Sequence, residues 1–534
     1  MSRNSSPWRL SRARLLGSAF PSFSTELLRL VAAASLAMAA SPAMAGPVLP
    51  TGGSVAAGSA SIGAPTGNAL TISQSSQRAI INWGSFSIGA GGLVQFNNGQ
   101  GATLNRVTGG NLSQIDGSLN ATGSVYLGYN TKAGNIQASS ASGNNPSNTS
   151  SASGSVDGSG DVGGFVGLNN GSLSSDNEVQ LTVGDASITA VGGFVGENAV
   201  YGTITGGSAN DTVTIGKNYV GGFAGFGYGA ITNSSVVTET APGAHSVSGQ
   251  NYIGGFAGWN GPDATIKNST ASDGIAGSVP VSGTGSAVGG FVGWNQSALL
   301  GDQSSDAVSA AEDVGGLVGF NSGAIMSSSA SGPTTVDGPN AGGLVGYNDA
   351  TGGITDSYAT GSVTGGPNGN NGGLVGYNLG TIDQSYATGA VSGVQNVGGL
   401  VGLNGGSVVL TYATGAVSGG VGGSDIGGLV GTNTGGFITE SYAVGAVSGG
   451  SNLGGLVGDN VNSGTIAKSY WDTQTAIVTV GIGSDTNGQS GNVHGLTTTQ
   501  LQSGLPAGFS PSVWGSSPGI NDGLPYLIPL TSSY

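Results

Sequence analysis

The feature that most limits what this chain can fold into is a six-residue block that occurs eleven times in its 534 residues. The block reads apolar-Gly-Gly-[Phe/Leu]-[Val/Ala]-Gly, with Ala and Asn once each at the first place. Successive copies start 26 to 35 residues apart, a period at which solenoid repeats occur. The copies start at Val162, Val191, Val220, Ile253, Val288, Val314, Ala341, Asn371, Val397, Ile426 and Leu453.

Two further patterns recur between the blocks. Ser-Tyr-Ala-Thr-Gly stands at 357–361 and 385–389, and Gly-x-Ile triplets stand at places such as 352–354 and 380–382. Each period therefore offers about three short strand-like segments separated by turn residues, and no segment has helical periodicity. We expect an all-β chain, a parallel β-helix or β-solenoid of about eleven coils that stack about 4.8 Å apart around a long, thin core.

The repeat predicts two ladders that run from coil to coil. The fourth residue of each block is expected to form one buried stack, and the flanking glycines allow close backbone approach. An asparagine follows the block by two places in ten of the eleven copies, and its amide suits a hydrogen-bonded ladder; Gly227 is the exception. The expected stack comprises Phe165, Phe194, Phe223, Phe256, Phe291, Leu317, Leu344, Leu374, Leu400, Leu429 and Leu456.

Six consecutive copies carry an aromatic residue immediately before the asparagine position: Phe226, Trp259, Trp294, Phe320, Tyr347 and Tyr377. Two interpretations stay open. If the position faces solvent, the rings form a strip that contacts sugars or protein; if it faces inward, the rings are core or corner packing. Under the first interpretation, Trp259, Trp294, Tyr347 and Tyr377 are the candidate binding residues.

The first 45 residues are expected to be a signal peptide. Five arginines precede an apolar run at 30–40, and Ala43-Met44-Ala45 supplies a small-residue cleavage site. The run is too short for a membrane anchor, so we expect the mature chain to begin at Gly46. Because the segment holds five of the eleven basic residues and one of the 26 acidic ones, its removal leaves a net charge of −19. Such a charge disfavours nucleic acid as a partner.

The repeat residues resemble a known family. Gly-Gly-Leu-Val-Gly with the following asparagine, then Ser-Tyr-Ala-Thr-Gly, is similar to the GLUG-motif repeat of bacterial surface proteins. The segments at 469–472, 495–498 and 521–527 resemble the closing segments of such arrays. We therefore expect a repeat array at 161–471 and a C-terminal cap at 472–534.

The segment 46–137 lacks the block and resembles the haemagglutination-activity domain of filamentous haemagglutinin-like exoproteins, on residues 79–89, 104–107 and 113–117. The resemblance implies a right-handed parallel β-helix and an outer-membrane two-partner secretion transporter as a partner. Gly128-Tyr129-Asn130-Thr131 stands where that family has Asn-Pro-Asn-Gly. We therefore expect a shortened domain that a Ser/Gly/Asn-rich linker at 138–160 joins to the array.

The sequence offers little for catalysis. The chain has no cysteine, and its two histidines, His245 and His494, are too far apart in an array to share one site. Asp161, Asp313 and Asp425 share the position before the block, but they lie in the first, sixth and tenth copies. A glycosidase needs two carboxylates roughly 5 to 10 Å apart. We expect no catalytic residue, no metal site and no cofactor; structural calcium stays open.

These observations favour a noncatalytic, adhesin-like protein that is secreted or held on the exterior of the outer membrane. Its expected partners are host or matrix glycan or protein, and not nucleic acid. Two alternatives stay open. One is a β-helical carbohydrate-active enzyme, which would show converging carboxylates; the other is a secretion-defective structural remnant, which the shortened N-terminal domain suggests.

Overall fold

The computed structural model describes residues 48–528, except for 90, 100, 109–117, 123, 129–134, 138–139, 143–153, 157–161, 175–176, 180, 185, 211–212, 238–245 and 273–280. The predicted signal peptide with its cleavage site, most of the predicted linker, Asp161 and His245 lie outside these ranges. In the described part, strands dominate and the α-helix α2 (Thr498–Gln502) has only five residues. No helix of this part has the length and apolar character to cross a membrane.

The first strands form two four-stranded sheets that enclose a buried core. Trp83 and Phe86 meet there edge to face at 5.3 Å, and the Trp83 indole donates to Asn105 Oδ1 at 2.8 Å. Strands β1 and β2 pair antiparallel with their neighbours, whereas the other pairs are parallel. The sheets contain β1 (Ser54–Ala57), β4 (Arg78–Trp83), β6 (Ala102–Val107) and β8 (Ser124–Gly128), and β2 (Ala60–Ile62), β3 (Ala69–Gln74), β5 (Leu93–Asn97) and β7 (Ser118–Ala121).

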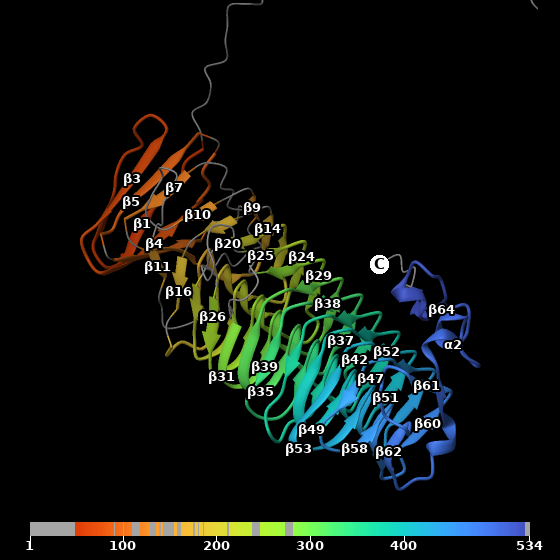
Figure 1. Ribbon diagram of the computed structural model, residues 1–534. Helices are drawn as coiled ribbons and strands as arrows, with labels where there is room; N and C mark the ends of the chain where they lie inside the picture. Colours follow the sequence, from red (N-terminus) through yellow and green to blue (C-terminus); the bar gives the residue numbers. More distant parts are fainter. Residues whose placement is uncertain are drawn as a thin grey trace, which may run out of the picture. The chain divides into compact units, whose positions relative to one another are not determined.

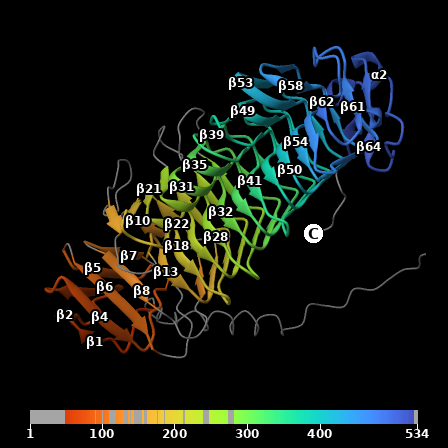
Figure 2. The same ribbon diagram turned by 90° about the horizontal axis from the view of Figure 1, so that it is seen from below.

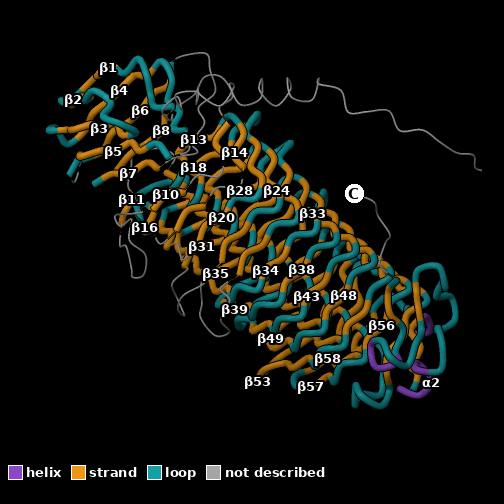
Figure 3. Tube along the Cα trace, turned by 90° about the horizontal axis from the view of Figure 1, so that it is seen from above, coloured by secondary structure: helices purple, strands orange, loops and turns teal. Residues whose placement is uncertain are grey.

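The repeats stack as coils whose strands join four long parallel sheets (Figures 1 and 3). We name each sheet after a residue type that recurs in it. The valine sheet runs from β11 (Gly154–Val156) to β58 (Ser451–Gly454), the isoleucine sheet from β9 (Asn135–Gln137) to β60 (Thr465–Ala467), and the tyrosine sheet from β10 (Ser140–Ser142) to β63 (Val493–Leu496). The all-β, parallel solenoid prediction is therefore confirmed.

The fourth sheet, which we call the aromatic sheet, carries the candidate binding residues, and several of its strands lie side by side in Figure 2. It comprises β13 (Val166–Asn169), β18 (Val195–Asn198), β23 (Ala224–Gly227), β28 (Ala257–Asn260), β32 (Val292–Asn295), β36 (Val318–Asn321), β41 (Val345–Asn348), β46 (Val375–Asn378), β50 (Val401–Asn404), β54 (Val430–Thr434), β59 (Val457–Val461) and β62 (Ile482–Asp485).

The expectation of about three strands per repeat is wrong, because the block itself turns a corner. Its first two residues lie in the valine sheet, as in β45 (Asn371–Gly372), and its fifth residue begins a strand of the aromatic sheet. At this corner a Cβ on Gly372 would overlap the carbonyl oxygen of Val375. The first glycine of the block, its second residue, is therefore a steric requirement of the corner that separates two of the four sheets.

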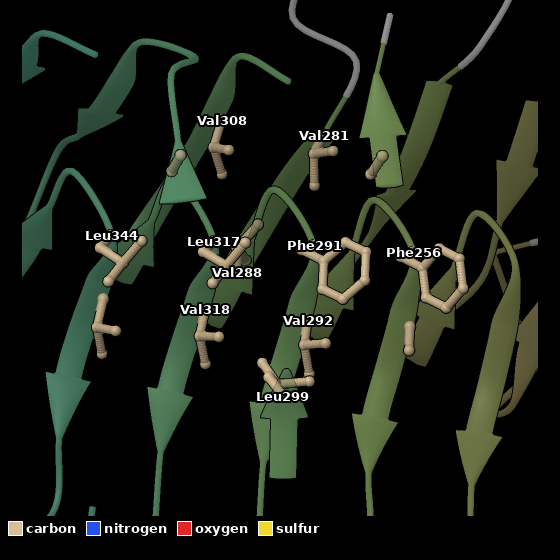
Figure 4. Close-up of a cluster of buried hydrophobic side chains, with 14 of the residues drawn as sticks. Phe256, Val281, Val288, Phe291, Val292, Leu299, Val308, Leu317, Val318 and Leu344 are labelled. Atoms are coloured by element: carbon tan, nitrogen blue, oxygen red, sulfur yellow. The ribbon is translucent and has the colours of Figure 1, made fainter. Parts of the chain in front are cut away.

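The predicted internal stack is confirmed. From Phe194 to Leu456 every fourth-place residue of the block is buried, and Phe165 at the start is partly buried. Neighbouring phenylalanines stack with centroids 4.6 to 4.9 Å apart. Figure 4 shows Phe256, Phe291, Leu317 and Leu344 in one row inside the coils, with Val292 and Val318 beside them.

The predicted asparagine ladder is also confirmed. Each side-chain amide donates to the next coil's asparagine at 2.7 to 2.9 Å, from Asn260 through to Asn460, and Asn169 donates to Asn198. Gly227 interrupts the ladder. Asn460 then donates to Asp485 at 3.1 Å.

Asp485 belongs to a twelfth coil that the sequence did not predict. Ile482 pairs with Val457, and Asp485 pairs with Asn460, so the segment occupies the block's place without the block's Gly-Gly pair. Burial opposes ionisation of Asp485, but hydrogen bonds from Asn460, Ser490 and Asn487 hold its pKa below the ordinary value. A carboxylate that only accepts hydrogen bonds thus ends a ladder of amide donors.

Candidate binding surface

The six aromatic residues singled out in the sequence form one column on consecutive coils. They occupy equivalent places in β23, β28, β32, β36, β41 and β46 and are register partners in the parallel pairs. We call this column the aromatic strip: Phe226, Trp259, Trp294, Phe320, Tyr347 and Tyr377. The structure therefore brings the four candidate binding residues together in a single row.

The rings of the aromatic strip alternate between two packing arrangements. Trp259 and Trp294 are stacked at 5.7 Å, and Phe320 and Tyr347 are stacked at 5.0 Å. The stacked pairs are separated by edge-to-face contacts, at 6.2 Å between Trp294 and Phe320 and at 5.1 Å between Tyr347 and Tyr377. Because an edge-to-face contact covers the face of only one of its two rings, the strip keeps ring faces that no neighbour within the strip covers.

The position of the strip excludes packing in the internal core, which the sequence had left open. All six rings are half-buried, while the Val or Ala and the Asn or Gly of the same strands are buried. None of the six belongs to the internal core of the coils. The strip therefore lies on the outer side of the aromatic sheet and is not core packing, although whether it binds a ligand stays a prediction.

Three tyrosines that the sequence analysis did not single out widen the strip at its N-terminal end. Tyr219 contacts Phe226 at 4.7 Å, Tyr252 contacts Trp294 at 5.5 Å, and Tyr228 contacts Trp259 at 5.1 Å. Tyr219 and Tyr252 also stack on each other at 4.8 Å. Tyr219 and Tyr252 stand immediately before their blocks, so a comparison of that position between copies could have found both of them.

Tyr219 and Tyr252 adopt a backbone conformation that is unusual for an aromatic residue, with φ of 52° and 58°. The left-handed region costs a non-glycine residue roughly 1–2 kcal/mol, and Asn or Asp tolerates it better. Most other coils do place Asn or Asp here, including Asp313, Asn340 and Asn396. The third and fourth coils thus accept a less favourable residue and gain ring contacts with the strip.

A row of polar side chains continues from these tyrosines along the later coils. Asn340 donates to Asp313 at 2.7 Å, Asn370 to Asn340 at 2.7 Å, and Asn396 to Asn370 at 2.8 Å. Thr432, in the aromatic sheet, donates to Asn396 at 2.7 Å, so this row borders the column that contains the strip. We call Asp313, Asn340, Asn370 and Asn396 the outer amide ladder.

Carboxylates lie beside the later part of the strip. Burial raises the pKa of the Tyr347 hydroxyl, and the charges of Tyr377, Asp349 and Asp313 raise it further. Asp313 and Asp425 sit at left-handed corners and accept from Asn340 and Asn452; Asp161 is not described. Of the two, Asp313 lies near the rings, and burial raises its pKa although Asn340 donates to it.

The Ser-Tyr-Ala-Thr-Gly motif produces a second column of aromatic side chains. The C-terminal segment that was predicted to be a cap packs against this column. Its tyrosines stack at 4.7 to 5.2 Å along β43 (Tyr358–Ala359), β48 (Tyr386–Ala387), β52 (Tyr412–Ala413) and β56 (Tyr442–Ala443), and β61 (Ser469–Asp472) carries Tyr470. Residues of the cap, including Leu501, Phe509 and Trp514, bury Tyr412, Tyr442 and Tyr470. The cap also contains β64 (Trp514–Gly515), which pairs with β65 (Tyr526–Leu527), and it lies at the C-terminal end in Figure 1.

The described residues give little support to catalysis. Burial raises the pKa of both Asp356 and Asp383, which lie on neighbouring coils, but neither carboxylate raises the pKa of the other. His494 is exposed and lies 5.8 Å from the Tyr470 ring, whereas His245 is outside the described ranges. Within the described part, no three or more His, Asp or Glu side chains gather in a way that could hold a metal ion.

Comparison with known proteins identifies two modules in the chain. The TPS secretion domain matches residues 47–289, and the GLUG motif matches residues 337–364. Two heme/hemopexin-binding proteins of Haemophilus influenzae are each 46% identical to this chain, over 81 and 72 residues. These segments are 15% and 13% of this chain but only 9% and 8% of those proteins, so the chain spans less than a tenth of their length. The match to the TPS secretion domain runs past residue 137, where the shortened domain was predicted to end, into the first coils.

Proposed function

We propose, on the premise that this chain carries a two-partner secretion domain and GLUG repeats, that it is a secreted, adhesin-like protein. Its solenoid attaches to host or matrix surfaces, to glycan or protein, through the aromatic strip. The role is noncatalytic, and the protein acts outside the cell or on its exterior. An outer-membrane transporter of the two-partner secretion type is its export partner.

One observation carries this proposal: six aromatic side chains, register partners on consecutive coils, lie half-exposed outside the core. Large rings that could be buried are normally buried, so a continuous row at the surface indicates a binding site. Tyr and Trp supply much contact area at low conformational cost, and repetition along the coils adds multivalency. The charge of −19 expected for the mature chain suits a soluble extracellular protein.

Attachment of protein-coated beads tests the binding surface. The mature chain is compared with a variant in which Trp259, Trp294, Tyr347 and Tyr377 are all replaced by Ala. We expect the variant to lose most attachment to host cells or extracellular matrix, because truncating a row of aromatic contacts removes the central contact area. Far-UV circular dichroism and the melting temperature of both proteins show whether the fold is kept.

A matched control removes exposed aromatic residues outside the strip. Tyr201 and Tyr358 are 79% and 36% exposed, so Tyr201→Ala with Tyr358→Ala reduces aromatic surface without touching the strip. This control is expected to attach like the parent. Equal attachment of the parent and the fourfold variant would remove the strip from the proposal.

Export is tested in the native host by fractionating cells and medium. We expect the chain in the medium or on the outer surface, and in the periplasm when the cognate transporter is deleted. Full-length chain retained in the cytoplasm would contradict the secreted role.

A further inference from the structure

We infer that the ligand of the aromatic strip is an uncharged glycan whose chain lies parallel to the solenoid axis, across consecutive coils. This inference rests on the proposed function, because it concerns the same surface. It adds the chemical class of the ligand and its direction on the protein. Three observations support it: the ring arrangement, the polar row beside the strip, and the distribution of charge.

The ring arrangement suits sugar rings. A pyranose presents an apolar face of C–H bonds that packs against an aromatic face, while its hydroxyls point to the sides. The edge-to-face contact at Tyr347–Tyr377 interrupts the stacking of the strip, and both of these rings are half-exposed. Coils repeat about every 4.8 Å, which is close to the length of one pyranose unit in an extended glycan. A chain along the axis therefore meets equivalent contacts at successive units.

The polar row supplies groups for the hydroxyls. In the outer amide ladder, Asn340 and Asn370 each donate one N–H to a neighbour and accept one hydrogen bond from the other side. An Asn side chain has two N–H donors and two lone pairs, so the half-buried Asn370 keeps a donor and an acceptor after the ladder is formed, whereas Asn340 is buried. Polar groups held in place beside aromatic surface are the usual composition of a small-molecule or sugar site.

The charge of the array argues against an anionic ligand. From residue 162 to 528 the sequence contains 22 Asp and Glu but only Lys217, Lys267 and Lys468 as basic residues. Lys468 is paired with Glu440 at 3.1 Å. Binding of sulfate or carboxylate groups normally uses Arg or Lys. Asp349 instead places negative charge near Tyr347, which repels sulfated or uronic acid polymers.

The strained tyrosines provide a variant that separates binding from folding. Tyr219 and Tyr252 stand where other coils use Asn or Asp, and both have positive φ. Replacing both by Asn places a residue that suits this backbone, so the fold should be kept or stabilised. The same change removes two rings from the wide end of the strip. Affinity should therefore fall while stability is kept or rises, which a purely structural role for these rings would not produce.

The test is affinity electrophoresis of the full mature chain in gels that contain a neutral glucan, a neutral mannan, a neutral galactan, heparin or polygalacturonate. We expect at least one neutral polymer to retard the protein and neither anionic polymer to do so. Retardation should not change between low and high salt, because no ion pairs form. The fourfold Ala variant should lose affinity by about tenfold or more. Tyr219→Asn with Tyr252→Asn should weaken binding and leave the melting temperature equal or higher.

The outcomes separate this inference from the proposed function. Retardation only by heparin or polygalacturonate, retardation by none of the neutral polymers, or neutral binding that survives the fourfold change would overturn the inference. If the fourfold variant nevertheless loses cell attachment, the proposed function stands with a protein or anionic ligand. Conversely, neutral glycan binding through the strip without any cell attachment would keep the inference and contradict the adhesin role.

Discussion

The side-chain oxygen of Asn260 has no hydrogen-bond donor among the described residues, because Gly227 occupies the asparagine position of the preceding coil. Asn198, on the other side of Gly227, turns its amide to backbone carbonyls instead. A Cβ on Gly227 would have its nearest neighbour, the Trp259 carbonyl oxygen, at 3.4 Å, so a side chain fits there without collision. The asparagine ladder thus has a gap that a substitution can close.

Gly227→Asn is expected to stabilise the protein. The new amide can donate to Asn260 and accept from Asn198, and closing one buried, unsatisfied position contributes about 1 kcal/mol or more to the free energy of unfolding. Urea unfolding measures the change. Gly227→Ala serves as the control, because it gains the reduced chain entropy without the hydrogen bonds. If the Asn and Ala variants unfold at the same urea concentration, the ladder contributes nothing at this coil.

The internal stack is expected to be essential in mid-array. Leu374 is fully buried between Leu344 and Leu400 of the neighbouring coils. Leu374→Asp places an unpaired carboxylate in this core, at a cost above the roughly 2–5 kcal/mol of a leucine truncation, and should unfold the adjacent coils. Limited proteolysis and thermal unfolding detect this. Leu374→Met, which nearly conserves volume, should cost below about 1.5 kcal/mol. A melting curve of the Asp variant that matches the parent would refute the stack.

The parts of the fold that could be predicted are those where one residue type returns at one position. The fourth-place Phe or Leu and the asparagines gave both ladders, because a solenoid converts sequence period into spatial contact. The number of sheets could not be read in this way. The corner inside the block depends on close backbone packing at glycines such as Gly372. The alternation of hydrophobic residues does not predict such a corner.

The twelfth coil and the wide end of the strip were missed for a different reason. Asp485 continues the asparagine ladder, but its segment has lost the Gly-Gly pair that marks a block. Tyr219 and Tyr252 stand at left-handed corners, from which their rings contact Phe226 and Trp294. Such contacts between columns follow from corner geometry, which a single sequence does not specify.

A buried carboxylate should make stability fall as pH rises. Asp302 is buried at a corner where Ser269 and Ser328 stand in the neighbouring coils. Burial raises the pKa of Asp302 to about 8, although hydrogen bonds from the Ser269 and Leu300 amides lower it. Its pKa in the unfolded chain is near the ordinary value of 3.8. Between these values the folded state holds a proton that the unfolded state has lost. Stability from this group is therefore complete below about pH 4 and is lost as pH rises toward about 8, at up to about 1.4 kcal/mol per pH unit.

Thermal unfolding between pH 4.5 and 8.5 tests this assignment. Asp302→Ser restores the residue type of the neighbouring coils, so its melting temperature should exceed that of the parent at pH 8 and approach it at pH 4.5. Asp302→Asn keeps the shape and removes the charge, and it should flatten the pH profile in the same way. A parent and two variants with parallel pH profiles would contradict a buried, protonated Asp302.

The last prediction concerns the bond that joins the C-terminal cap to the tyrosine column. Tyr442 donates its hydroxyl to the Pro525 carbonyl oxygen and accepts from Asn521 Nδ2 at 2.9 Å, and the whole side chain is buried. Tyr442→Phe keeps the ring contacts with Tyr412 and Trp514 but removes one partner each from the buried Pro525 carbonyl and the half-buried Asn521 amide, which still bond each other at 2.8 Å. We expect a cost of about 1–3 kcal/mol that falls on the attachment of the cap. Because Trp514 packs against Tyr442, its fluorescence should report release of the cap at a lower urea concentration than unfolding of the coils. Tyr358→Phe removes a hydroxyl from the uncovered end of the same column and should leave the cap transition unchanged. If the cap and the coils of the Tyr442 variant still unfold together at the parent's midpoint, the cap is not held by this bond.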